Sequence, residues 1–259
     1  MKLPLVSILI CGIGGGALAE SLLSAEEVIA RTIERAARSK AVATNYTFLK
    51  LRVNEELESD QEVKSSRKRM YRVTPIRGEL YSRLVAKDDQ PLTDSEQKKE
   101  EEREQRFREK SSGAKHMNKE DAREVTLDRA LTEHFLFTLV ERQVIDGRPA
   151  YVLSFRARSN MPNKEIRDRI LNRLAGQVWV DAEEFEVVRL DVSLTDRVSI
   201  GWGVLGSMNK FDVLFERFRL DDGSWQVKEA SGIVAYREVL KSKQMRWRET
   251  TSQFEKVPR

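Results

Sequence analysis

Apolar and polar residues alternate along most of this chain, with the two-residue period that is typical of β-strands. The clearest case is Gln177–Val192, where Val178 and Val180 flank Trp179 and alternation resumes after a short polar turn. A turn between two alternating segments predicts an antiparallel hairpin. Because Trp179 adds a large apolar group to the second face, we expect this sheet to be covered in part on both sides.

Similar alternation predicts strands in both halves of the chain. Asp146 and Gly147 lie between the alternating segments Leu136–Ile145 and Pro149–Arg158, and an Asp-Gly pair in that position is typical of a tight hairpin turn. The other predicted strands are Tyr46–Leu57, Gln61–Val73, Leu80–Val85, Phe211–Leu220, Trp225–Glu229, Ser231–Leu240 and Met245–Phe254. The sequence therefore predicts an antiparallel sheet.

The first predicted helix has both an end signal and helical spacing. Ser24 and Glu27 form a capping box, in which each side chain can accept a hydrogen bond from the backbone N–H of the other residue. Apolar residues then recur every three or four positions to about Arg38. A short second helix is predicted to begin after Pro162 and to end at Gly176, where it leads into the hairpin.

A charged helical segment interrupts the predicted strands. Thr93 and Glu96 form a second capping box, and Gln97–Lys110 has Phe107 as its one large apolar side chain. Such a helix is solvated, is held by neighbouring opposite charges, or docks by one edge. We expect an insertion at about 93–131 within a single domain that spans 20–259.

The N-terminus has the layout of a cleaved secretory signal, which we place at residues 1–19. Lys2 precedes an uncharged, mostly apolar segment, and the small residues before Glu20 are typical of a cleavage site near Ala19. A retained membrane anchor is the alternative. Such a signal would direct the protein to the periplasm, where the signal would be cleaved off. Cleavage would also remove Cys11, the only cysteine, so the exported chain would have no disulfide and no thiol nucleophile.

Composition and charge limit the classes of partner that the protein is expected to bind. The formal net charge of +4 is small for a chain with 34% charged residues of both signs. This balance does not indicate nucleic-acid binding, but it allows transient contact with an anionic membrane surface. The basic segment Lys64–Arg72 could contact acidic lipid headgroups or protein partners, and its simpler interpretation is a solvent-facing strand.

Motifs for catalysis or metal binding are missing from the sequence. His116 and His134 are the only histidines, and neither has a partner at metal-ligand spacing. The paired carboxylates, such as Asp221 and Asp222, fall in predicted turns. An envelope hydrolase would need a clustered acid, base or nucleophile, so we expect a protein that is not an enzyme and carries no metal or cofactor.

The order of these elements resembles the outer-membrane lipoprotein-sorting (LolA/LolB-like) superfamily. The resemblance rests on the hairpin at Val144–Leu153, on Gly176–Asp181 with Arg189 downstream, and on the segments Phe211–Phe215, Asp222–Trp225 and Thr251–Val257. It implies an α+β fold, in which a strongly curved antiparallel half-open β-barrel has helices covering its concave face. It also implies an apolar cavity that binds acyl chains of lipids or lipoproteins for transfer through the cell envelope.

Strand alternation suggests which residues would line such a cavity. The candidates are Trp179, Phe211, Phe215 and Trp247, although ordinary core packing can also explain each of them. The alternative function is an envelope sensor or protein-interaction module of the same fold, with a filled core and no lipid cargo. The two hypotheses differ in whether the chain's own side chains fill the concave face.

Overall fold

The computed structural model describes residues 23–39, 45–109, 129–200, 206–238 and 241–257 of the 259-residue chain. The expected signal peptide lies outside the described residues. So do His116 and the central part of the expected insertion, residues 110–128.

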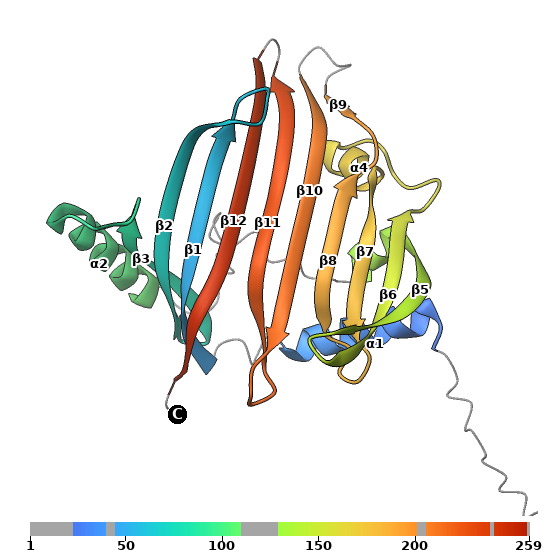
Figure 1. Cartoon of the computed structure of the whole chain (residues 1–259), viewed down its shortest axis with the longest axis horizontal. Helices are drawn as coiled ribbons and strands as arrows, with labels where there is room; N and C mark the ends of the chain where they lie inside the picture. Colours follow the sequence, from blue (N-terminus) through green and yellow to red (C-terminus); the bar gives the residue numbers. More distant parts are fainter. Residues whose placement is uncertain (1–22, 40–44, 110–128, 201–205, 239–240, 258–259) are drawn as a thin grey trace, which may run out of the picture.

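The described residues form twelve strands in one antiparallel sheet (Figure 1). The strands are β1 (Tyr46–Leu57), β2 (Val63–Ile76), β3 (Glu79–Lys87), β4 (Gln90–Pro91), β5 (Phe135–Ile145), β6 (Arg148–Ala157), β7 (Leu174–Asp181), β8 (Val187–Leu194), β9 (Val198–Ile200), β10 (Gly206–Arg219), β11 (Trp225–Glu238) and β12 (Lys241–Lys256). Their order is β4-β3-β2-β1-β12-β11-β10-β8-β7-β6-β5, and β9 pairs with β10 outside this path. The sheet is open, because β4 and β5 end it on opposite sides, and the chain has the mainly antiparallel α+β architecture expected from its sequence.

Helices accompany the sheet at three places (Figure 1). They are α1 (Ala25–Ser39), α2 (Asp94–Glu109), α3 (Arg129–His134) and α4 (Ile166–Leu171). Helix α1 lies across the lower ends of the strands from β5 to β8, α4 lies near the upper ends of β7 and β8, and α2 lies beyond β3. The capping box of α1 is confirmed, since Ser24 N–H donates to Glu27 Oε2 at 2.8 Å and Glu27 N–H donates to Ser24 Oγ at 3.2 Å.

The main apolar core lies between α1 and one face of the sheet, which we call the helix face. Val28 and Ile29 of α1 pack in one cluster with Leu153, Val178 and Val180. Those three strand residues have no accessible surface. Burying a large aliphatic side chain stabilises a fold by about 1.5–3 kcal/mol, so this cluster holds α1 on the sheet. The opposite face, which carries Trp179, is called the groove face.

The predicted end of the second helix at Gly176 is wrong. Helix α4 ends at Leu171, and Gly176 pairs with Val192 and Phe155 inside the sheet. A Cβ atom at Gly176 would lie 1.9 Å from the carbonyl oxygen of Asp191 and 2.9 Å from Cζ of Phe155. Glycine is therefore required here by the close approach of neighbouring groups, and not by a left-handed turn.

The predicted break between Trp225–Glu229 and Ser231–Leu240 is also wrong, because β11 is continuous through Ala230. The pairing between β10 and β11 shifts register where Glu216 pairs with Glu229 and the next residue, Arg217, pairs with Val227. This shift is a β-bulge. A bulge inserts one residue and interrupts the two-residue alternation without ending the strand; this one lies at Lys228, two residues before the predicted break.

The β1–β3 side of the sheet has smaller apolar clusters and more charge. Tyr46, Phe48 and Val73 form one cluster, with Phe254 stacked on Phe48 at 5.0 Å between ring centroids. On the helix face nearby, Arg52 is buried and its Nε lies 2.7 Å from Glu249 Oε1. This half therefore relies more on ion pairs between strands.

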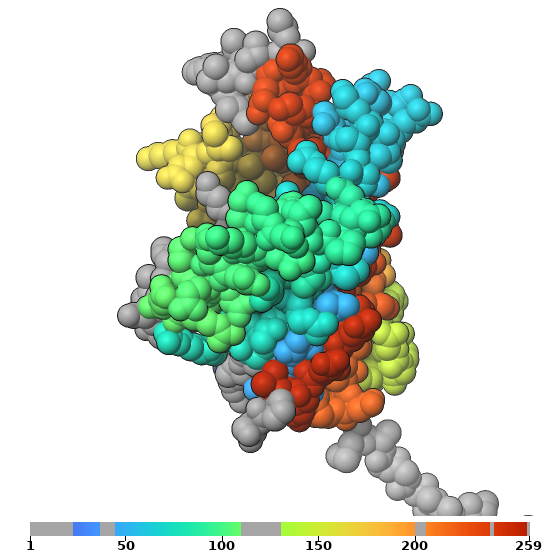
Figure 2. Space-filling view, turned by 90° about the vertical axis from the view of Figure 1, so that its left-hand side faces the viewer, coloured from blue at the N-terminus to red at the C-terminus, as the bar shows by residue number. Residues whose placement is uncertain are grey.

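Helix α2 covers the outer edge of β3 (Figure 2). Glu100 accepts a hydrogen bond from the backbone N–H of Leu84 at 3.1 Å, and Arg103 donates to the carbonyl of Ser82. Glu100 and Arg103 also form an ion pair with each other. The two side chains thus satisfy edge groups that would otherwise be open to pairing with another strand.

Candidate ligand-binding faces

An apolar strip extends from the core across the helix face of β10, β11 and β12. It consists of Phe211, Val213, Val234, Met245 and Trp247, which strand register and alternation place on the same face as buried Phe215. Exposure increases along the strip, from half-buried side chains near Phe215 to Met245, which is 38% exposed. The core therefore continues into a partly accessible apolar surface.

Glycine shapes the middle of the apolar strip. Gly232 pairs with both Val213 and Trp247. A Cβ atom at Gly232 would lie 2.8 Å from Nε1 of Trp247. The indole of Trp247 therefore lies against the backbone of β11, where any larger residue would displace it.

The structure brings three of the four predicted site residues onto one face. Phe215 lies in the main core, Trp247 packs against the margin of that core, and Phe211 is half-buried further along β10. Trp179 lies on the groove face, because it pairs with Arg189 and Val152. It is separated from the other three by the thickness of the sheet.

Trp179 has polar partners on the groove face. Its Nε1–H donates to Oε1 of Gln143 at 3.0 Å, and the guanidinium carbon of Arg189 lies 4.9 Å from the ring centroid. The indole therefore has a cation–π contact with Arg189 and a satisfied hydrogen bond. These contacts give Trp179 a structural role on its own face.

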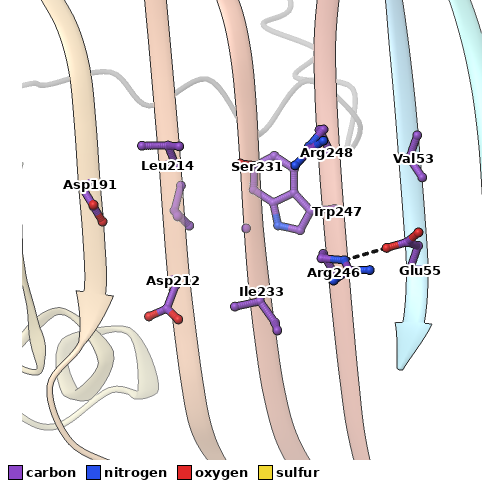
Figure 3. Close-up of a pocket in the computed structure, with 12 residues that line it drawn as sticks. Val53, Glu55, Asp191, Asp212, Leu214, Ser231, Ile233, Arg246, Trp247 and Arg248 are labelled. Atoms are coloured by element: carbon purple, nitrogen blue, oxygen red, sulfur yellow. Dashed lines mark hydrogen bonds and ion pairs between the residues drawn. The ribbon is translucent and has the colours of Figure 1, made fainter. Parts of the chain in front are cut away.

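A groove of about 580 Å³ crosses the groove face over the central strands (Figure 3). Register places its side chains in two rows across the strands, with carboxylates on β8 and β10, apolar groups in the middle and arginines on β12. The rows are Asp191, Leu214, Ser231 and Arg248, and then Asp212, Ile233 and Arg246. Two carboxylates therefore lie at the β8–β10 end, and the arginines lie at the β12 end, where Glu55 of β1 also lines the groove beside Arg246.

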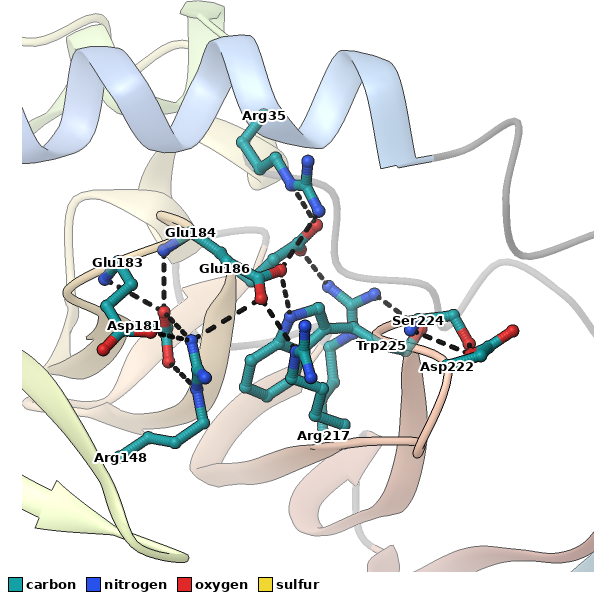
Figure 4. A network of polar contacts seen from close by, with 11 residues as sticks. Arg35, Arg148, Asp181, Glu183, Glu184, Glu186, Arg217, Asp222, Ser224 and Trp225 are labelled. Atoms are coloured by element: carbon teal, nitrogen blue, oxygen red, sulfur yellow. Dashed lines mark hydrogen bonds and ion pairs between the residues drawn. The ribbon is translucent and has the colours of Figure 1, made fainter.

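A polar network fastens α1 to the turns at the lower end of the sheet (Figure 4). Glu186 is 3% exposed and contacts Nε of Arg35 at 2.9 Å and Nη1 of Arg217 at 2.6 Å. The neighbouring Glu184 accepts a hydrogen bond from Nε1 of Trp225 at 3.0 Å. The network links the helix, the turn between β7 and β8, and the start of β11.

Asp181 is the fully buried acid of this region. Its carboxylate accepts hydrogen bonds from Nε and Nη2 of Arg148 at 2.7 and 3.0 Å, and from the backbone N–H groups of Glu183 and Glu184. Burial works against the charge, but the Arg148 contact and the two backbone donors outweigh it and lower the pKa of Asp181. The group is a structural anion that shapes the turn.

The network and the groove were not predicted from the sequence. Asp181 had a usable signal, since it follows a predicted strand and opens a turn, where a carboxylate often bonds to backbone N–H groups two or three residues on. The groove had a weaker signal, in the charges that alternate with Trp247 at Arg246 and Arg248. Its formation depends on the register of five strands, which no single segment reveals.

Within the described ranges, no group of three or more His, Cys, Asp or Glu residues is placed to hold a metal ion. In the same part of the chain, no helix has the length and apolar character needed to span a membrane. His134 is buried, and its Nε2 lies 2.8 Å from Oδ1 of Asn172. This contact gives His134 a structural role.

Comparisons with known proteins found similar solved structures only. No family model and no curated sequence matches it. A domain assigned to outer membrane lipoprotein sorting from Vibrio parahaemolyticus matches with 12% identity and a TM-score of 0.38, over 90% of this chain and 93% of that chain. A LolA superfamily protein from Nitrosomonas europaea matches with 12% identity and a TM-score of 0.33, over 92% and 95%.

A third match is MucB, in a crystal structure of its complex with MucA, with 10% identity and a TM-score of 0.25 over 89% of this chain and 99% of that chain. Such TM-scores are too low to transfer a site or an activity. Among these structural neighbours, one is named as a lipoprotein-sorting domain and one as a LolA superfamily protein.

Proposed function

We propose that this chain is an exported, non-catalytic protein that binds an acyl chain of a lipid or lipoprotein on the apolar strip of its helix face. The observation that carries the proposal is the continuity between the buried core at Phe215 and the partly exposed residues Phe211, Met245 and Trp247. An acyl chain laid along this strip would bury both its own methylenes and these side chains. Each buried methylene contributes about 0.8 kcal/mol, so binding needs no catalytic or charged group.

The position of α1 supports the same proposal. The helix covers the lower end of the helix face and is fastened there by Arg35, whose guanidinium reaches Glu186 and Glu184. The strip begins beside this covered region and becomes more exposed away from it. A bound chain would extend the apolar core along β10–β12 without displacing the helix.

The test starts with protein purified from its own cell envelope without detergent. Native mass spectrometry with lipid extraction identifies any acyl-bearing species, and a fluorescent fatty-acyl probe then measures affinity. We expect Phe211→Glu to weaken probe binding by at least about tenfold, because a carboxylate would have to be buried beside the ligand.

Leu214→Glu is the matched control, since it places the same charge on the same strand but on the groove face. It should leave acyl binding within about twofold, and thermal melting of both variants checks that they fold. Protein that carries no lipid and does not bind the probe would contradict acyl binding. Equal loss in both variants would contradict the location of the site.

The alternative is a sensor or protein-interaction module with a filled core. Its supporting observation is that Val213 and Trp247 already pack against the chain's own core, which leaves less apolar surface for a ligand. Under this alternative, purified protein is free of lipid and Phe211→Glu changes the capture of a protein partner instead of an acyl probe.

A further inference from the structure

The positions of the charged side chains in the groove indicate which kind of ligand it can bind. Asp191 on β8 and Arg248 on β12 lie in one row, three strand spacings apart. At about 4.8 Å per spacing, this is roughly 14 Å. Leu214 and Ser231 lie between them, so an acidic end and a basic end flank a less polar centre.

The basic end is oriented to accept a further anion. Arg246 contacts Glu55 at 2.6 Å and Arg248 contacts Glu229 at 3.2 Å, and in both pairs the arginine atom is Nε. A guanidinium has five N–H donors, so each pair holds its arginine in place while the terminal nitrogens stay available. The side chains are 48% and 65% exposed.

The acidic end is less neutralised. Asp191 has no ion-pair partner among the described residues, and Asp212 contacts Nζ of Lys210 at 3.5 Å. A ligand with charges of one sign, such as an acidic lipid headgroup or a nucleic acid, would be attracted at one end and repelled at the other. The groove therefore suits a ligand that carries both signs.

We propose that this groove binds an extended segment of a partner protein with the pattern basic–x–apolar–x–acidic. Extended chains rise about 3.3 Å per residue, and residues i, i+2 and i+4 point to one side. The first and last side chains of this pattern are thus about 13 Å apart, which matches the distance from Asp191 to Arg248. Its central apolar residue faces Leu214 and Ile233.

This site differs from the acyl site, because its charged side chains lie on the opposite face of the sheet from Phe211 and Met245, while Val213 and Trp247 of the strip also border the groove. Charge changes in the groove leave Phe211 and Trp247 in place. The acyl-probe assay on the same groove variants therefore shows whether one site fails without the other.

The test is a titration of the full chain with short peptides, in which binding is measured from the changes in backbone amide chemical shifts. The probe contains Lys-Ser-Leu-Ser-Glu between Gly-Ser flanks, and the controls replace its Glu by Lys or its Lys by Glu. We expect the mixed-charge peptide to bind about three- to tenfold tighter than either control at low salt, as exposed ion pairs allow. Shifts should centre on Ser231 and Gly232.

Charge reversal in the protein makes the test specific. Asp191→Lys should turn the preference toward the peptide with two acids, and Arg248→Glu should turn it toward the peptide with two lysines. Lys228→Glu, at an exposed β11 position that does not line the groove, should retain the mixed-charge preference. Absence of binding by all three peptides, or preferences that the two groove variants leave unchanged, would overturn the proposal.

Discussion

Strands β5–β8 and β10 carry a continuous apolar core under α1, whereas β12 and β1–β3 carry small clusters and charged pairs on the same face. Leu153 and Val178 have no accessible surface in the first region. In the second region the buried residues include a charged one, Arg52, which is paired with Glu249. The comparison shows that one sheet can be stabilised by helix burial at one side and by strand-to-strand ion pairs and an edge helix at the other.

The largest effect is expected in the core half. Leu153→Ala removes a fully buried side chain that contacts the α1 cluster. The lost burial and the remaining cavity should lower the free energy of unfolding by about 4 kcal/mol. Urea unfolding followed by circular dichroism measures this change. Val144→Ala, at a 74% exposed site, should change it by less than about 0.5 kcal/mol, and similar losses in both variants would contradict the proposed core.

The second prediction concerns the polar anchor of the same half. Asp181→Asn removes the charge that Arg148 and two backbone N–H groups bind, and should cost about 3 kcal/mol at neutral pH. Because the folded pKa of Asp181 is lowered, its stabilisation is present above the unfolded pKa of about 3.9 and is lost as pH falls through the folded pKa.

The difference in unfolding free energy between the wild type and Asp181→Asn should therefore shrink as pH falls below about 4. Urea unfolding across an acidic pH series measures it. Asp221→Asn, at an exposed turn position, is the matched control. A difference that stays constant down to low pH would show that the charge of Asp181 does not stabilise the fold.

The pattern of residues within each segment predicted most of the helices and strands, but not how the strands pair with one another. The capping pair Ser24 and Glu27 and the Asp146-Gly147 turn act over a few residues, so the sequence shows them directly. Gly176 was misjudged because its requirement comes from Phe155 and Asp191, which approach it from neighbouring strands. Contacts set by the sheet as a whole are not visible in one segment.

In the candidate sites too, features within one strand were predicted and features that depend on strand pairing were not. Alternation correctly placed Phe211 and Phe215 on one face of their own strand. Whether Trp179 shares that face depends on register across β7, β8 and β10, and the structure places it on the other side. The rows of the groove arise in the same way, since Asp191 and Arg248 are 57 residues apart in the sequence and meet only through the intervening strands.

The smallest effect is expected at the edge of the charged half. Arg103→Ala removes the donor to the Ser82 carbonyl and the partner of Glu100. Both contacts are partly exposed, so the loss in unfolding free energy should be about 1 kcal/mol. Arg106→Ala, on an exposed part of α2, should change it by less than about 0.5 kcal/mol.

Hydrogen exchange gives this last prediction a local readout. The backbone N–H of Leu84 donates to Glu100, which Arg103 holds in place. Exchange at Leu84 should therefore become faster in Arg103→Ala, while exchange at Leu153, deep in the other half, changes only by the small loss in global stability. If Leu84 stays as protected as in the wild type, α2 does not close this edge of the sheet. The charged half would then be held by its strand-to-strand pairs alone, and the contrast with the helix-covered half would be sharper.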